Sequence, residues 1–145
     1  MKKKKCKTFR LKEANALLPE IEKRLKRLQK KKEAYARVHD QLFVHELVSA
    51  AERLNGLAEN DDLEARIAGL EQAIEDLAKD VEAILEMGAI LRDLERGRID
   101  FLADLEGKPV FWSWELGEPS IGFYHHTNRN PRERIPIPAR ILKAP

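Results

Sequence analysis

Side chains that can take part in chemistry gather in the C-terminal third of the chain, between residues 92 and 137. The residues before this region are mostly strong helix formers, which hold a fold in place more often than they carry out chemistry. The later region contains both tryptophans, two adjacent histidines and several charged residues: Trp112, Trp114, Glu118, Tyr124, His125, His126 and Arg134. Any functional site is therefore expected there.

The adjacent histidines first suggest a metal site. A catalytic zinc ion usually takes three protein ligands and keeps a fourth position open. His125 and Glu118 are the candidate ligands, with Asp100 or a histidine of the first helix as a third. Adjacent residues of a strand point to opposite faces, so His125 and His126 cannot both bind one metal ion. Taken singly, each histidine is more often a hydrogen-bonded or packed side chain, and we expect no metal or other cofactor.

Three arginines follow the histidines and suggest a pocket for an anion or a small polar molecule. Guanidinium groups match carboxylate and phosphate geometry, and Arg129, Arg132 and Arg134 lie close together in the sequence. In the alternative interpretation the tryptophans belong to the core and the arginines to solvent or to Glu118. We expect Arg134 and Glu118 to form an ion pair that orients His125. The candidate ligand-binding residues are Trp114, Glu118, His125, Arg134 and Asp100.

The region from about residue 90 onward has the alternation of a β-sheet. Apolar and polar residues alternate with a period of two, and glycine stands in three turns, at residues 96–97, 106–107 and 117–119. This pattern predicts an antiparallel meander of three or four strands. A sheet this small is marginal by itself, so one face must rest on helices. The face with Trp112, Trp114 and Phe123 is expected to do so.

The pairing of the two strands in the last hairpin can be predicted by counting outward from its expected tip at Gly117-Glu118. Trp112 then lies opposite Phe123, and Val110 lies opposite His125. In this register Ser113 points to the face opposite His125. A nucleophilic relay of Ser113, His125 and Asp100 is therefore not expected.

Two long helices precede the sheet. Residues 61–87 carry apolar residues with alternating spacings of four and three, the seam of a coiled coil: Leu63, Ile67, Leu70, Ile74, Leu77, Val81 and Ile84. Asp61 or Asp62 is expected to cap this helix. The first helical region should divide at Pro19 into a short helix over 11–18 and a long one over 18–54. The short link that follows Asn55-Gly56 predicts an antiparallel hairpin.

Charge is strongly segregated along the chain. Residues 1–32 contain fourteen basic and three acidic residues, whereas residues 33–94 contain five basic and fifteen acidic residues. The basic segment could bind nucleic acid, or it could fold back and neutralise the acidic segment. We favour the second interpretation, with residues 26–32 beside residues 82–86. Lys2 to Lys5 precede any periodic pattern and are expected to form a solvated tail.

Several classes of protein are disfavoured. Cys6 is the only cysteine, so an intrachain disulfide is excluded and a cysteine nucleophile is not expected. No apolar run is long enough to span a bilayer, and the basic start lacks the apolar segment of a secretory signal. A cytoplasmic protein that does not bind membranes is expected. Phosphate-binding and dinucleotide-binding glycine motifs and the G-x-S-x-G motif are absent from the sequence.

The sequence resembles the bacterial family catalogued as domain of unknown function 2203, from Phe9 to Ile137. The family's opening pattern, F-x-x-x-E-A-N-x-L-L-P, corresponds here to Phe9, Glu13, Ala14, Asn15, Leu17, Leu18 and Pro19. Its later patterns correspond to Gly97, Asp100, Phe101, Trp114, Gly117, Glu118, Ile121, Tyr124, His125 and Arg134. The sequence departs from the family pattern at three positions, where Leu102 replaces the usual proline, Ser113 the usual cysteine and Tyr124 the usual tryptophan. The absence of that cysteine argues against essential thiol chemistry. The resemblance implies an architecture and favours His125 over His126, but it implies no reaction.

Together these observations predict an α+β fold in a single domain over residues 1–145. A helical hairpin over 6–88, kinked near Pro19, is followed by a β-meander over 89–128 and an extended, proline-rich tail over 129–145. The leading functional hypothesis is a non-enzymatic interaction module with a small polar ligand pocket on its sheet. The alternatives are a small enzyme, such as a metal-assisted hydrolase that uses Glu118 and His125, and a nucleic-acid-binding protein. A homodimer through the helical seam is expected.

Overall fold

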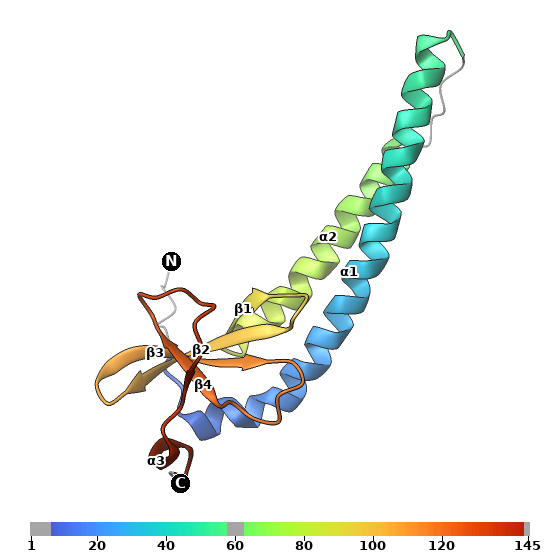
Figure 1. Ribbon diagram of the computed structural model, residues 1–145. Helices are drawn as coiled ribbons and strands as arrows, with labels where there is room; N and C mark the ends of the chain where they lie inside the picture. Colours follow the sequence, from blue (N-terminus) through green and yellow to red (C-terminus); the bar gives the residue numbers. More distant parts are fainter. Residues whose placement is uncertain (1–6, 58–62, 144–145) are drawn as a thin grey trace, which may run out of the picture. The chain divides into compact units, whose positions relative to one another are not determined.

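The computed structural model describes residues 7–57 and 63–143, and it has the predicted α+β fold (Figure 1). Two long helices come first in the sequence, and a five-stranded antiparallel sheet follows. The chain divides into two compact units, one made of Met1–Lys26 and Val81–Pro145 and the other of Arg27–Asp80. The first unit contains the sheet, and the second contains a helical hairpin. Within the described residues, neither helix has a segment long and apolar enough to cross a bilayer.

The first helix, α1, runs without interruption over Leu11–Leu54 and includes Pro19. The predicted division at Pro19 is therefore wrong. A proline inside a helix removes one hydrogen bond and costs about 3 kcal/mol. Leu18 and Ile21, which flank Pro19, are both buried, so tertiary packing offsets that cost. As predicted, the helix ends before Asn55-Gly56, where Gly56 takes a φ of 73°.

The second helix, α2, covers Leu63–Glu86, close to the predicted bounds. The expected capping residues Asp61 and Asp62 lie outside the described residues. In the helical unit, the Lys31 ammonium lies 2.9 Å from Asp76 Oδ2 and 2.7 Å from Asp80 Oδ2. Hydrogen bonds to Asp80 and Asp76 raise the pKa of Lys31. The basic segment of α1 thus pairs with the acidic helix.

The pairing partners of Lys31 differ from the predicted ones, which were residues 82–86. They lie earlier in α2, at Asp76 and Asp80.

The sheet has one more strand than predicted. Its strands are β1 (Ala89–Asp93), β2 (Arg98–Leu105), β3 (Lys108–Glu115), β4 (Phe123–His126) and β5 (Ile135–Pro136), in that spatial order. All neighbours are antiparallel. The tail that was expected to be only extended contributes β5 and a short helix, α3 (Ala139–Leu142).

The predicted register of β3 and β4 is wrong by one residue. Trp112 pairs with Tyr124, and Phe111 pairs with His125. The connection between these strands is an asymmetric loop over residues 116–122, because Ile121 is buried and its N–H donates to Asn15 Oδ1 at 2.8 Å. Counting outward from a symmetric tip therefore fails. A slip of one residue moves every side chain of a strand to the other face, so His125 and Phe123 lie opposite to the faces predicted for them.

One face of the sheet forms the core with the start of α1. The Phe9 ring packs edge-on against Phe101 with ring centroids 5.2 Å apart, and the Phe9 carbonyl accepts a hydrogen bond from Trp112 Nε1 at 2.8 Å. Gly88, with a φ of 98°, lies beneath the same ring, where a Cβ atom would come within 2.1 Å of it. The buried apolar side chains on this face of β2 and β3 are Ile99, Phe101, Ala103, Val110, Trp112 and Trp114.

Candidate functional site

The other face of the sheet carries polar side chains that are mostly buried. Arg98 pairs with Glu115 across β2 and β3, and Asp100 pairs with Ser113. Directly paired residues of antiparallel strands project to the same face. His125 of β4 projects to this face as well, because its partner Phe111 is two residues from Ser113. We call Arg98, Asp100, Ser113, Glu115 and His125 the polar face.

Asp100 is the centre of the polar face and is fully buried, with 0% exposure. Its Oδ2 accepts hydrogen bonds from Arg92 Nε at 2.8 Å and from His125 Nε2 at 2.7 Å. A charge this deeply buried is tolerated only when it is paired and hydrogen-bonded. Its second oxygen, Oδ1, has no hydrogen-bond partner among the described residues. The three residues come from three strands, so Asp100 ties those strands together.

A β-bulge places Arg92 beside Asp100. The pairing of β1 with β2 passes from Leu91 opposite Ile99 to Asp93 opposite Arg98, so Arg92 is an extra residue in its strand. Bulges of this kind redirect a side chain. The Arg92 guanidinium also lies over the Phe111 ring, 4.9 Å from its centroid.

His125 is buried and both of its ring nitrogens face acceptors. Nε2 lies 2.7 Å from the Asp100 carboxylate, and Nδ1 lies 3.2 Å from the His126 carbonyl. The prediction that Ser113 lies opposite His125 is wrong, since both are on the polar face. The relay is nevertheless not assembled, because both nitrogens contact other groups and the Ser113 hydroxyl has no hydrogen-bond partner among the described residues.

Glu118 and Arg134 form the ion pair that the sequence predicted. Arg134 donates from Nη2 to Glu118 Oε1 at 2.6 Å and from Nη1 to Glu118 Oε2 at 3.0 Å. Glu118 Oε1 also accepts the Glu115 N–H at 2.7 Å, and Arg134 lies over the Phe123 ring at 4.2 Å. The expected link to His125 is wrong, because Asp100 holds that ring. The pair instead closes the loop that precedes β4.

Trp114 lies on the core face, away from His125 and Asp100. Its Nε1 donates to the Glu118 carbonyl at 3.0 Å, and it is 1% exposed. Trp114 and Glu118 line a small cavity of about 190 Å³ beside Asn15 and Pro19. The predicted ligand-binding residues therefore separate into an Asp100–His125 pair on one face and a Trp114–Glu118–Arg134 group around the loop.

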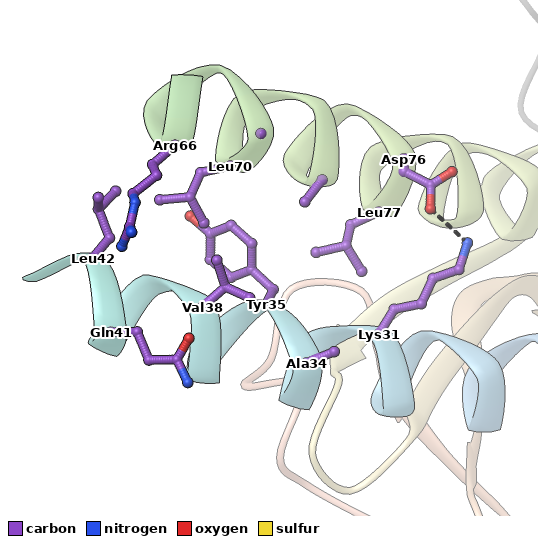
Figure 2. Close-up of a pocket in the computed structure, with 12 residues that line it drawn as sticks. Lys31, Ala34, Tyr35, Val38, Gln41, Leu42, Arg66, Leu70, Asp76 and Leu77 are labelled. Carbon is purple, nitrogen blue, oxygen red and sulfur yellow. Dashed lines mark ion pairs between the residues drawn. The ribbon is translucent and has the colours of Figure 1, made fainter. Parts of the chain in front are cut away.

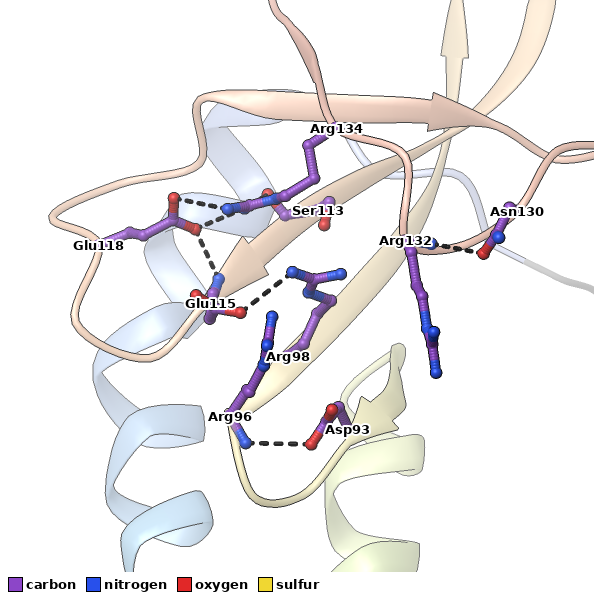
Figure 3. A network of polar contacts seen from close by, with 9 residues as sticks. All are labelled: Asp93, Arg96, Arg98, Ser113, Glu115, Glu118, Asn130, Arg132 and Arg134. Atoms are coloured by element: carbon purple, nitrogen blue, oxygen red, sulfur yellow. Dashed lines mark hydrogen bonds and ion pairs between the residues drawn. The ribbon is translucent and has the colours of Figure 1, made fainter.

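A larger polar cavity of about 610 Å³ opens beside the polar face. Figure 3 shows three of the arginines that line it, Arg96, Arg98 and Arg132. Four arginines line it, Arg92, Arg96, Arg98 and Arg132, and we call it the arginine pocket. Its other lining residues are Leu91, Asp93, Asn130 and Pro131. Guanidinium groups from β1, from the turn after it, from β2 and from the segment after β4 thus converge on one space. The arrangement suits an anion.

The arginines of the pocket differ in how far they are already neutralised. Arg98 donates to Glu115 Oε1 at 3.1 Å, but its buried Nε has no hydrogen-bond partner among the described residues. The side chains of Arg96 and Arg132 form no ion pair within residues 7–57 and 63–143. The one lining carboxylate is Asp93, whose pKa is lowered by the backbone N–H of Arg96, which it accepts at 3.0 Å. The Asp93 carboxylate is therefore already hydrogen-bonded within the turn that follows β1.

The sequence patterns indicated only one side of the arginine pocket. Arg132 was a predicted anion-binding residue, but Arg92, Arg96 and Arg98 were not predicted to lie with it. Arg129, the neighbouring candidate, is exposed and is not among the lining residues. The available signal was the recurrence of arginine on both sides of the turn at Gly97, since residues that flank a tight hairpin turn lie side by side.

A metal site is not assembled among the described residues. No three His, Cys, Asp or Glu side chains there come together as ligands for an ion. The two candidate ligands each have another partner, Arg134 for Glu118 and Asp100 for His125.

The family assignment agrees with the resemblance noted from the motifs. A family model described as "Uncharacterized conserved protein (DUF2203)" matches residues 7–137. The chain belongs to the DUF2203 family. No curated protein and no solved structure matches it.

The structure gives physical roles to the opening motif of this DUF2203 chain. Phe9 covers Phe101, and Asn15 holds the loop before β4. Glu13 accepts the backbone N–H of Arg10 at 3.0 Å, and this contact lowers the pKa of Glu13. The motif thus joins the start of α1 to the sheet.

Replacement of Asp100 by asparagine should destabilise the fold strongly. The variant Asp100→Asn keeps the shape of the side chain but leaves the Arg92 guanidinium without its counterion. Breaking a buried ion pair costs about 3–5 kcal/mol. Urea denaturation followed by tryptophan fluorescence measures the loss. The control is Asp104→Asn on the same strand, where the exposed amide can still accept the Gly107 N–H; equal losses in the two variants would contradict the role given to Asp100.

The Glu118–Arg134 pair should contribute measurably to stability. Arg134→Met removes two charge-assisted hydrogen bonds to a carboxylate that is only 23% exposed. We expect the free energy of unfolding to fall by about 1–3 kcal/mol. The matched control is Arg140→Met, which breaks an ion pair with Glu106 that is well exposed and should cost little. An unchanged melting temperature for Arg134→Met would show that the pair is not structural.

Proposed function

We propose that this DUF2203 chain is a non-enzymatic binding module whose sheet takes a small anion, a carboxylate or a phosphate, in the arginine pocket. One observation carries the proposal: four guanidinium groups and a single carboxylate line one cavity of about 610 Å³. That volume lies within the usual range for small-molecule sites, about 300–1,000 Å³.

The charges around the arginine pocket support an anionic ligand. Arg92 and Arg98 are held in place by Asp100 and Glu115, so they form a rigid wall. Arg96 and Arg132 keep their charges uncompensated by any carboxylate of the described chain. Preorganised donors lose little freedom on binding, which favours affinity.

The contacts of the polar face favour binding over catalysis. Both nitrogens of His125 face acceptors of the protein, and Glu118 is held by Arg134 and by the Glu115 N–H. A general base needs a free lone pair within reach of its substrate. The residues that the alternative hypothesis required for hydrolysis are instead engaged in structural contacts.

Titration calorimetry with inorganic phosphate and with citrate, at constant ionic strength, tests the proposal. We expect saturable one-to-one binding of at least one of these anions by the wild-type chain. Arg96→Gln and Arg132→Gln should each weaken it by about ten- to a hundredfold, because each removes a charge-assisted contact of about 1.5–3 kcal/mol.

The control variant is Arg129→Gln, which removes an exposed arginine of the same segment that does not line the pocket. Its affinity should equal that of the wild type. Absence of saturable binding by both anions would overturn the proposal. So would an equal loss of affinity in Arg129→Gln, which would indicate non-specific attraction to a basic surface.

A further inference from the structure

The helical unit, Arg27–Asp80, contains a groove of about 490 Å³ between α1 and α2 (Figure 2). The floor contains apolar side chains of both helices, with Leu70 and Leu77 from α2 and Tyr35 and Leu42 from α1. Figure 2 shows Lys31 and Asp76 facing each other at one end of the groove and Arg66 at the other. The residues Ala34, Val38, Gln41, Gly69 and Ala73 complete the lining.

The lining leaves apolar surface exposed and allows another helix to come close. Val38 is 49% exposed although it lines the groove. Three of the lining residues, Ala34, Gly69 and Ala73, have small side chains or none. Helices pack at 8–10 Å when the side chains at the contact permit it, and small residues permit the shorter distances. The groove is thus shaped for the side chains of a helix.

The charges beside the groove indicate which helix fits it. Residues 27–37 of α1 contain five basic and one acidic residue, a net charge of +4. At the same level, residues 71–80 of α2 contain one basic and four acidic residues, a net charge of −3. The ion pairs of Lys31 with Asp76 and Asp80 show that these two segments lie side by side. Whatever lies across the groove meets one basic and one acidic helix side by side.

We infer that the groove is the self-association surface of this chain, and that its occupant is the same groove face of a second copy. In a dimer with its twofold axis parallel to the helices, α1 of each copy lies along α2 of the other, at the same level. The basic segment of each copy then lies along the acidic segment of the other, and Lys31 and Asp76 are the charged members of these segments that line the groove. A twofold axis perpendicular to the helices would instead place like-charged helices together. The pair of hairpins forms a four-helix bundle with Val38 of each copy inserted into the groove of the other.

Sedimentation velocity of matched lysine variants of the full chain tests this inference. Val38→Lys and Ile74→Lys replace side chains of equal exposure, 49% and 48%, but only Val38 lines the groove. We expect a dimer for the wild type and for Ile74→Lys. The dissociation constant of Val38→Lys should rise at least about tenfold, because a charge would be buried in the interface. Circular dichroism should show equal helix content in all three proteins.

A monomeric wild-type chain at every soluble concentration would overturn the inference. Dissociation by Ile74→Lys but not by Val38→Lys would overturn it as well, because the interface would then lie on another face. If the wild type is monomeric and an apolar fluorescent dye binds it but not Val38→Lys, the groove takes a small molecule and the inference is wrong.

Disulfide trapping tests the arrangement of the two copies. In a Cys6→Ser background, one protein carries Ala34→Cys on α1 and the other carries Ala73→Cys on α2. Both positions line the groove. Ala34 follows Lys31 by three residues and Ala73 precedes Asp76 by three, so in antiparallel helices the two positions lie at one level. Oxidation of the mixture should give the mixed disulfide. Formation of the Ala73→Cys homodimer instead would show that α2 lies against α2, which contradicts the proposed axis.

Discussion

The structure of the sheet depends on how the carboxylate of Asp100 is neutralised. This side chain is fully buried, and its charge is held by Arg92 of β1 and His125 of β4. Because a buried charge without partners is costly, the three strands must keep the register that brings these residues together. The bulge at Arg92 and the asymmetric loop before β4 are the local features that make this register achievable.

The patterns of the sequence predicted elements better than they predicted pairings. The change of hydrophobic period near residue 90 separated helix from sheet correctly, because periodicity reflects which face each element buries. Pro19 misled the prediction, since burial of Leu18 and Ile21 outweighs a local preference. The register of β4 depended on the contact between Asn15 and Ile121, which lie 106 residues apart. No local pattern in the sequence indicates such a contact. Because the register of β4 decides which face His125 occupies, the pairing of Asp100 with His125 could not be predicted either.

The candidate site, like the fold, was predictable only in part. The Glu118–Arg134 pair was predictable because Arg134 directly precedes the apolar run Ile135–Ile137, where a charged side chain needs a nearby partner. The arginine pocket was only half predictable, because the arginines on either side of Gly97 meet Arg132 through the fold of the sheet and not through their spacing in the sequence. The proposed anion site and the proposed dimer groove belong to different compact units of the chain. Loss of one function therefore need not entail loss of the other.

The register of β3 and β4 is the most direct test of this account, because it decides whether His125 faces Asp100. Nuclear Overhauser contacts between backbone protons of labelled protein report that register. The structure predicts cross-strand contacts between Trp112 and Tyr124 and between Phe111 and His125. Contacts that instead place Trp112 opposite Phe123 and Val110 opposite His125 would put the imidazole on the core face, and the account of the buried carboxylate would then be wrong.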